Sequence, residues 1–171
     1  MARLFFALWP DEEAQKKLSE VSHQFKDENL RLTRTSNLHI TLAFLGEVSA
    51  YDQIALIQQA KKIQGSAFFL ELNSIGCWRK PGILWVAPED TPKPLTTLVE
   101  QLQIIIKLQG LNVDERLYKP HVTIARKLKQ FTIPKMTIQI TSAFNNFSLV
   151  VSKSTDNGVD YQVIHDWALK K

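Results

Sequence analysis

Hydrophobic positions along the chain follow two periods, and each period predicts its own kind of element. Short runs of apolar, β-branched and aromatic residues indicate strands, because such residues suit a half-buried pleated backbone. Apolar residues spaced three and four apart indicate amphipathic helices. Strands are predicted near residues 4–9, 39–46, 67–75, 82–87, 121–127, 134–141, 143–152 and 160–168.

Three helices are predicted between these strands, with starts that the local chemistry explains. Ser49 and Asp52 form a capping box for the second helix. Thr91 is the expected N-cap of the third helix, with Pro92 at its first helical position. The predicted helices begin at Pro10, Ser49 and Pro92 and end at Phe25, near Gly65 and at Gly110.

The order of elements occurs twice along the chain. Each half has a strand, a helix, an arginine-bearing connector and a strand that begins with histidine; the connectors are "NLRLTRTSNL" (29–38) and "LNVDERLYKP" (111–120). A chain of 171 residues suits one compact domain. We therefore expect a single, internally duplicated α+β domain over residues 1–171. Its two lobes of antiparallel sheet would face a central cleft, with the helices outside.

The two histidine strands carry the same motif. "HITLAFLG" starts at His39 and "HVTIARK" starts at His121, and each has threonine two positions after the histidine. Side chains on a strand alternate between two faces. His39, Thr41 and Ala43 should therefore share one face, and Ile40, Leu42 and Phe44 should point into the core. One such pair is usually structural, but two in corresponding places indicate a shared site.

Paired histidines and threonines suit chemistry on a phosphoryl group. At neutral pH, two imidazoles can supply one general base and one general acid. Threonine hydroxyls and basic side chains can hold phosphate oxygens. A zinc site would need three or four ligands, and the remaining histidines, His23 and His165, are predicted on the surface or in packing. No metal or cofactor is expected.

Charge and cysteine content indicate the kind of partner and the cellular compartment. The net charge of +4 and pI of about 9.2 favour a polyanionic partner, and residues 116–135 contain six basic side chains and no acid. The single cysteine, Cys77, fits a reducing cytoplasm and is predicted to pack as a small apolar residue. No apolar run is long enough to cross a bilayer, so no membrane partner is expected. Trp78, beside two basic residues, is the best candidate for stacking on a nucleobase.

Both motifs resemble the paired motifs of the two-histidine (2H) phosphoesterase superfamily. The segments "RLFFALWPDEE", "NLHITLAFLGEV", "LYKPHVTIARK" and "LVVSKS…YQVIHDWAL" are further similar to the bacterial and archaeal RNA 2′,3′-cyclic phosphodiesterases, also called 2′–5′ RNA ligases. The resemblance spans nearly the whole chain. It implies a bilobal α+β fold and metal-independent hydrolysis of RNA 2′,3′-cyclic phosphate ends to 2′-phosphomonoesters, with weak ATP-independent 2′–5′ ligation.

The resemblance also implies roles for individual residues. His39 corresponds to the proton donor and His121 to the proton acceptor, while Thr41 and Thr123 would hold the phosphate. Arg126 matches an arginine that closes the second motif, yet alternation places it opposite His121. Either the strand bulges or ends there, or Arg126 is structural.

Two functions remain as hypotheses at this stage. The first is an RNA cyclic phosphodiesterase that acts as a cytoplasmic monomer on RNA or oligonucleotides with a 2′,3′-cyclic phosphate end. The alternative is a non-catalytic RNA-end-binding module of the same fold. Intact His39, His121, Thr41 and Thr123 favour the enzyme, because catalysis requires all four.

Overall fold

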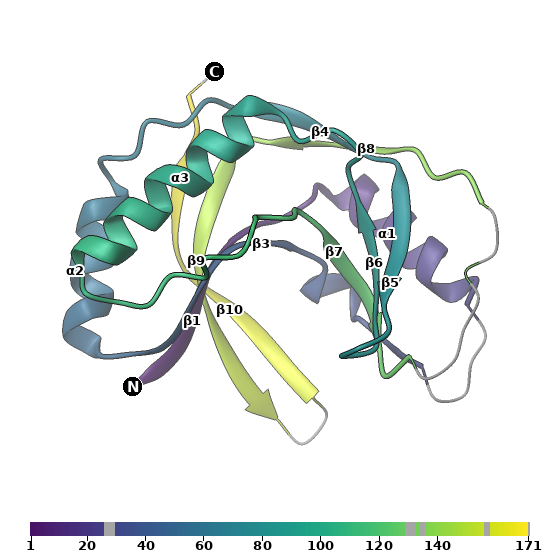
Figure 1. The fold of residues 1–171 in the computed structure, drawn as a ribbon, viewed down its shortest axis with the longest axis horizontal. Helices are drawn as coiled ribbons and strands as arrows, with labels where there is room; N and C mark the ends of the chain where they lie inside the picture. Colours follow the sequence, from purple (N-terminus) through teal and green to yellow (C-terminus); the bar gives the residue numbers. More distant parts are fainter. Residues whose placement is uncertain (26–29, 129–132, 134–135, 156–157, 171) are drawn as a thin grey trace.

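The structure of the protein is a computed structural model, which describes residues 1–25, 30–128, 133, 136–155 and 158–170. Helices and strands given below are those of this part of the chain (Figure 1). The elements in chain order are β1 (Ala2–Leu8), α1 (Glu12–His23), β2 (Arg31–Leu32), the 3₁₀ helix η1 (Thr35–Asn37), β3 (Ile40–Val48), α2 (Ala50–Ala60), β4 (Phe68–Leu72), β5 (Ser74–Trp78), β6 (Ile83–Ala87), α3 (Lys93–Leu108), β7 (Val122–Arg126), β8 (Ile140–Phe144), β9 (Asn146–Thr155) and β10 (Gly158–Ala168).

All the main strand pairings are antiparallel, as predicted. The larger sheet has the order β10-β9-β1-β3-β7-β6-β5, with β2 also pairing with β7. Strands β4 and β8 form a separate two-stranded sheet. The two motif strands, β3 and β7, are neighbours at the centre of the larger sheet, where Ile40 pairs with Val122. The predicted α+β class with antiparallel sheets is confirmed.

The helices pack across the two halves of the chain. Helix α1 packs against β7 and β8, although it comes before β3 in the sequence. Helix α3 packs against β3 and α2, although it leads into β7. Figure 1 shows α2 and α3 side by side at one end of the molecule and α1 at the other. Each motif strand is thus covered by a helix from the other half of the sequence.

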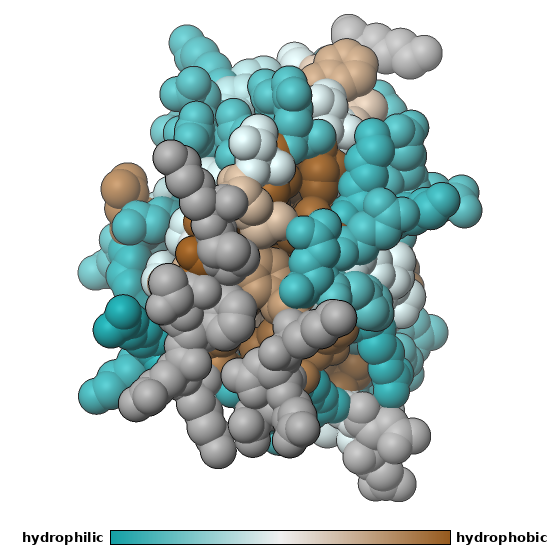
Figure 2. Space-filling view, turned by 90° about the vertical axis from the view of Figure 1, so that its right-hand side faces the viewer, coloured by the Kyte–Doolittle hydropathy of each residue, from teal (hydrophilic) through white to brown (hydrophobic). Residues whose placement is uncertain are grey.

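The hydrophobic core follows from the predicted stripes on helices and strands. In α1, Leu18 is fully buried, and in α3, Leu98 and Leu102 are fully buried. Most of the buried apolar side chains join one cluster between sheets and helices. Turned by 90°, the molecule shows hydrophobic side chains in a band between polar ones (Figure 2). Burial of the apolar side chains in this cluster is the main stabilising contribution to the fold.

Several predicted boundaries need correction. Helix α1 begins at Glu12 rather than Pro10, and Asp11 is its N-cap, with its carboxylate accepting a hydrogen bond from the Ala14 amide at 2.9 Å. The capping box of α2 is confirmed, with the Asp52 amide donating to Ser49 at 3.1 Å, but the helix already ends at Ala60.

Three further corrections concern the start of α3 and two of the predicted strands. Pro92 takes the N-cap of α3 in place of Thr91. The strand predicted at 67–75 is two strands, β4 and β5, in different sheets. The strand predicted at 134–141 begins only at Ile140, and residues 134–135 lie outside the described part.

Candidate active site

Each motif histidine stands immediately before its strand and is oriented by a main-chain carbonyl. The Nδ1 atom of His39 lies 2.6 Å from the carbonyl oxygen of Asn37, and Nδ1 of His121 lies 2.8 Å from that of Lys119. A carbonyl only accepts, so Nδ1 carries the proton in both rings and donates it. The Nε2 atom of each neutral ring is therefore an acceptor. For His39, Nε2 accepts a hydrogen bond from the Thr41 hydroxyl at 3.2 Å.

The central strand pairing brings the two motifs together. With Ile40 opposite Val122 in an antiparallel pair, Thr41 falls beside His121, and His39 falls beside Thr123. Thr41 and His121 accordingly line the same cavity. The sequence prediction that both His-Thr pairs share one surface agrees with this geometry.

The two imidazoles differ in their surroundings. The His39 ring lies among Phe5, Trp9 and Tyr161, with ring centroids 5.1, 5.4 and 4.9 Å away. The His121 ring meets Trp78 edge-on, with centroids 4.6 Å apart and planes at 81°. His39 is thus enclosed by aromatic groups from strands distant in sequence, whereas His121 rests against a single indole.

Burial controls the charge on both rings. Desolvation lowers the pKa of His39 to about 4; its bond to Asn37 opposes this shift, and the charges of His121 and Arg126 add to it. Desolvation also lowers the pKa of His121, opposed by its bond to Lys119 and assisted by the charge of Arg126. In the free protein at pH 7, both imidazoles are therefore largely neutral.

A β-bulge explains the position of Arg126. Leu84 pairs with Ala125 but Trp85 pairs with Thr123, so Ile124 is an extra residue in β7. The bulge reverses the alternation, and Arg126 comes to the same face as Thr123, opposite Ile83. Its charge consequently acts on both histidines. Of the two alternatives that the sequence left open, the bulge is the one observed.

The same bulge decides the face of Ala125. Strict alternation would put Ala125 on the face of His121, but it is fully buried in the core. The core and site faces of β7 therefore exchange between Thr123 and Ala125.

Bulges in β3 likewise bring Phe44 out of the core. The pairing of β3 with β1 shifts twice, so that Phe44 lies opposite Phe5, while Leu42 and Leu45 are extra residues. Alternation predicted Phe44 in the core, but its side chain is 55% exposed. Its ring contacts Phe5 at a centroid distance of 5.7 Å, and Phe5 in turn contacts His39 at 5.1 Å.

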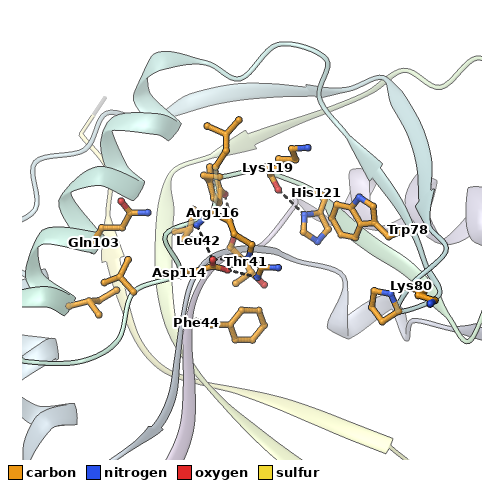
Figure 3. A pocket seen from close by; sticks show the side chains of 16 residues that line it. Thr41, Leu42, Phe44, Trp78, Lys80, Gln103, Asp114, Arg116, Lys119 and His121 are labelled. Atoms are coloured by element: carbon orange, nitrogen blue, oxygen red, sulfur yellow. Dashed lines mark hydrogen bonds and ion pairs between the residues drawn. The ribbon is translucent and has the colours of Figure 1, made fainter.

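A cavity of about 600 Å³ adjoins the motif residues. Thr41, His121 and Phe44 line it together with Trp78 and Lys80 from the β5–β6 hairpin (Figure 3). Other walls come from the connector before β7 and from α3: Gln103, Ile106, Val113, Asp114, Arg116, Leu117, Tyr118 and Lys119. The cavity therefore begins at one end of the paired motifs and extends away from His39.

Sequence reasoning missed Tyr118, which links the two motifs. Its hydroxyl donates to the main-chain oxygen of Thr41 at 3.1 Å. Burial raises the pKa of this phenol, so it stays protonated and keeps its donor. The only signal in the sequence is its place in the connector three residues before His121.

The remaining histidines stand apart from the motifs. His23 bonds to the Ser19 carbonyl on exposed α1, and His165 packs on Trp167. Within the described ranges, no group of three or more His, Cys, Asp or Glu side chains is placed to hold a metal ion. None of the helices in that part is both long and apolar enough to span a membrane.

Comparison with known proteins identifies relatives of this arrangement. The sequence profile of the LigT-like phosphoesterases matches residues 8–85. The RNA 2′,3′-cyclic phosphodiesterase of Escherichia coli is 32% identical, with 98% of this chain and 96% of that protein covered. The enzyme of the same name from Methanocaldococcus jannaschii is 31% identical, with 96% and 99% covered.

Solved structures give the same result at the level of the fold. E. coli LigT complexed with 3′-AMP superposes with a TM-score of 0.93 at 31% identity, covering 99% of both chains. A crystal structure described as a phosphoesterase has a TM-score of 0.94, also at 31% identity. Since sequence and fold agree over almost the full length of both partners, this chain belongs to the RNA 2′,3′-cyclic phosphodiesterase family of LigT-like phosphoesterases.

Proposed function

We propose that this chain opens RNA 2′,3′-cyclic phosphate ends to 2′-phosphomonoesters by acid–base catalysis with His39 and His121, without a metal ion. The observation that carries the proposal is the matched orientation of the two rings. Each imidazole donates a hydrogen bond from its Nδ1–H group to a carbonyl, which leaves Nε2 for proton transfer, and each lies beside a threonine of the other motif. This arrangement offers two proton-transfer groups around one phosphoryl group.

In the proposed reaction, Thr41, Thr123 and Arg126 hold the non-bridging oxygens of the cyclic phosphate. Nε2 of His121 takes a proton from water as its oxygen attacks phosphorus. The bond from phosphorus to the 3′ oxygen breaks in line with the attack, and His39 supplies a proton from Nε2 to that oxygen. The product is a 2′-phosphomonoester, and the two histidines have exchanged protonation states.

His39 must be protonated at Nε2 to act as the acid, although burial holds its pKa at about 4 in the free protein. The negative charge of the bound substrate offsets this effect of burial. A phosphodiester anion between the rings favours the imidazolium and raises the pKa of both histidines. Substrate binding and protonation of His39 are therefore coupled in this mechanism.

The same site would also support slow 2′–5′ ligation. A 5′ hydroxyl in place of water would lose its proton to His121 and attack the cyclic phosphate, and the 3′ oxygen would leave as before. No ATP is needed, because the cyclic ester already carries the activation. Water competes at bulk concentration, so hydrolysis should dominate.

Alanine replacement of either histidine tests the proposal. His39→Ala and His121→Ala should each lower turnover of a 2′,3′-cyclic nucleotide by about 10²- to 10⁴-fold, as expected for loss of a general acid or base. His23→Ala changes an exposed side chain of α1; it is the matched control and should retain turnover. Circular dichroism would check that all three variants are folded. Near-wild-type turnover in either motif variant would contradict the mechanism.

Phosphorus NMR of the product tests the assignment of acid and base. A 2′-phosphate is expected, and a 3′-phosphate as the main product would overturn the assigned roles. RNA-end binding by the wild type with no turnover at all would favour the non-catalytic alternative.

Chelation tests the absence of a metal requirement. In the proposed mechanism the threonine hydroxyls donate hydrogen bonds to the phosphate and Arg126 offsets its negative charge. Turnover should therefore be the same before and after treatment with EDTA. Activity lost on chelation and restored by added zinc or magnesium would instead indicate a metal-assisted reaction.

A further inference from the structure

Asn37 is one of the four polar side chains buried in the described part of the chain, and the other three are serines. Only 8% of its surface is exposed. It is the last residue of η1 and stands two residues before His39. Burying an amide is unfavourable unless its polar groups are hydrogen-bonded, so the partners of Asn37 show what the fold gains from it.

Asn37 bonds to two separate parts of the molecule. Its main-chain oxygen accepts the hydrogen bond from Nδ1 of His39 at 2.6 Å. Its side-chain Nδ2 donates to the main-chain oxygen of Val159 at 2.8 Å. Val159 lies on β10, 122 residues further along the chain. The side chain therefore ties the carbonyl that orients His39 to the edge strand of the larger sheet.

Strand β10 also contacts the His39 ring directly. Tyr161, two residues after Val159, meets the imidazole edge-on, with ring centroids 4.9 Å apart and planes at 79°. The same strand thus holds His39 in two ways, at Nδ1 through the Asn37 carbonyl and through the ring of Tyr161.

The 3₁₀ helix alone holds the Asn37 carbonyl weakly. The hydrogen bonds of a 3₁₀ helix have poorer geometry than those of an α-helix, and carbonyls at a helix end lack partners within the helix. The Asn37 amide bonds to the Arg34 oxygen at 2.8 Å, but this bond engages the nitrogen of residue 37 and not its carbonyl. The bond from the side chain to Val159 adds an anchor on the residue that carries the carbonyl.

The second motif fixes its carbonyl in another way. His121 follows Pro120, whereas His39 follows Leu38. A proline ring holds its own φ at about −65° and restricts the preceding residue to extended backbone, so covalent geometry limits the movement of the Lys119 carbonyl. Leu38 imposes no such restriction. The two halves thus differ in how they hold the acceptor for Nδ1.

We propose that Asn37 is a positioning residue for His39. Its bond to Val159 fixes the Asn37 carbonyl, which keeps the proton of the neutral ring on Nδ1 and leaves Nε2 facing the phosphate. Pro120 has the corresponding role for His121. The proposal rests on the proposed function, because the tautomer of His39 affects the rate only if Nε2 transfers a proton.

Replacement of Asn37 tests this role with two independent readouts. Asn37→Ala keeps the main-chain carbonyl and loses the tie to β10. With a 2′,3′-cyclic nucleotide, kcat should fall about five- to tenfold, the effect of one hydrogen bond, with little change in KM. In ¹⁵N NMR spectra at a pH where the rings are neutral, the Nε2–H form of His39 should become measurable, while His121 stays in the Nδ1–H form. Spectra of His39→Ala and His121→Ala assign the signals.

Two variants complete the comparison. Asn73→Ala is the matched control, because the Asn73 side chain also makes one bond to the main chain, from the Glu89 amide at 2.9 Å, and does not line the cavity. Its kcat and both tautomers should equal those of the wild type. Pro120→Ala should give the reverse pattern, with the Nε2–H form measurable in His121 and His39 unchanged.

A lower kcat together with a changed tautomer in His39 alone would support the role of Asn37. If kcat falls while the His39 tautomer is unchanged, Asn37 is structural only; an unchanged kcat in folded Asn37→Ala would also overturn the proposal. Should Asn37→Ala not fold, Asn37→Ser gives the same two readouts, because it keeps a polar group in the buried position but is too short to replace the amide. A wild type without turnover would overturn the proposed reaction, whereas the tautomer measurement would still decide whether Asn37 orients the ring.

Discussion

At the scale of the residue, His39 and His121 each donate a hydrogen bond from Nδ1 to a main-chain carbonyl, but different aromatic side chains surround the two rings. Donation from Nδ1 to a carbonyl two residues earlier follows from the motif itself, since both strands begin in the same way. That His39 and Thr41 lie on the same face could therefore be predicted from the sequence. The aromatic rings around His39 could not, because Phe5, Trp9 and Tyr161 come from both ends of the chain and only folding assembles them.

This difference in burial predicts the pH dependence of the reaction. The mechanism needs a single proton on the pair. In the free protein, kcat/KM should fall below about pH 4, where both rings are charged, and fall again above the lowered pKa of His121, where both are neutral. Its maximum should therefore lie between about 4 and the ordinary histidine value of 6.5.

The profile of kcat should lie at higher pH than that of kcat/KM. In the bound state the phosphate anion raises the pKa of both imidazoles, so the acidic and the basic limb of the kcat profile both shift to higher pH. Steady-state rates with a 2′,3′-cyclic nucleotide across the pH range measure both profiles. A kcat/KM that stays level from about pH 6 to about pH 9 would show that no protonated histidine is required.

At the scale of the element, β-bulges decide which side chains of the motif strands reach the site. Strict alternation correctly grouped His39 with Thr41 and His121 with Thr123. It failed for Ala43 and Phe44, which follow the extra residue Leu42, and for Ala125 and Arg126, which follow the extra residue Ile124. A bulge depends on the pairing with neighbouring strands and leaves no fixed signature in these stretches, so the sequence alone could not locate it.

The connector before β7 supplies a contact that positions the first motif. Tyr118 bonds to the carbonyl of Thr41, whose side chain bonds to His39. Tyr118→Phe should lower kcat about five- to tenfold with little change in KM, because the ring remains while the strand loses its tie; one hydrogen bond contributes about 1 kcal/mol. Tyr51→Phe is the control, since Tyr51 is exposed on α2.

Kinetics and unfolding together distinguish positioning by Tyr118 from general stability. Urea unfolding measures the loss of folding free energy, and steady-state rates at a temperature well below the transition measure kcat and KM. Added ligand should not restore kcat, because occupancy is unaffected. If kcat is unchanged while stability falls, the Tyr118 bond is structural only.

At the scale of the whole molecule, the two halves of the chain are interleaved. The repeated order of elements predicted that each half gives one His-Thr motif to a shared surface. The prediction was one motif from each of two facing lobes, whereas the two motif strands are neighbours in one sheet. The repeated order also could not show that α1 covers β7 and that α3 covers β3, because a hydrophobic stripe predicts that a helix is buried but not against which strand. Since each motif strand is covered by a helix from the other half, neither half holds a complete core of its own.

The distribution of basic residues over the whole molecule leads to the last prediction. Lys80 and Lys119 border the cavity, and Arg126 lies on the site face of β7. Lys129 and Lys135 of the basic stretch predicted to contact RNA lie outside the described residues. Arg116 of the same stretch is paired with Asp114. Lys80 and Lys119 are thus placed to meet phosphates beyond the one that reacts.

RNA binding should therefore depend more steeply on salt than binding of a cyclic mononucleotide. Each additional phosphate contact on a single strand should steepen the slope of log K against log salt by about 0.7. Lys80→Gln should make the slope for a short RNA less steep by about 0.7 and leave the slope for the mononucleotide unchanged. Lys62→Gln, on an exposed lysine just past the end of α2 that bonds to Gln59, is the control. Titrations of His121→Ala protein at several salt concentrations would measure these slopes without turnover. Equal slopes for RNA and mononucleotide would show that the cavity rim does not hold the RNA chain and that its lysines are solvated surface charge.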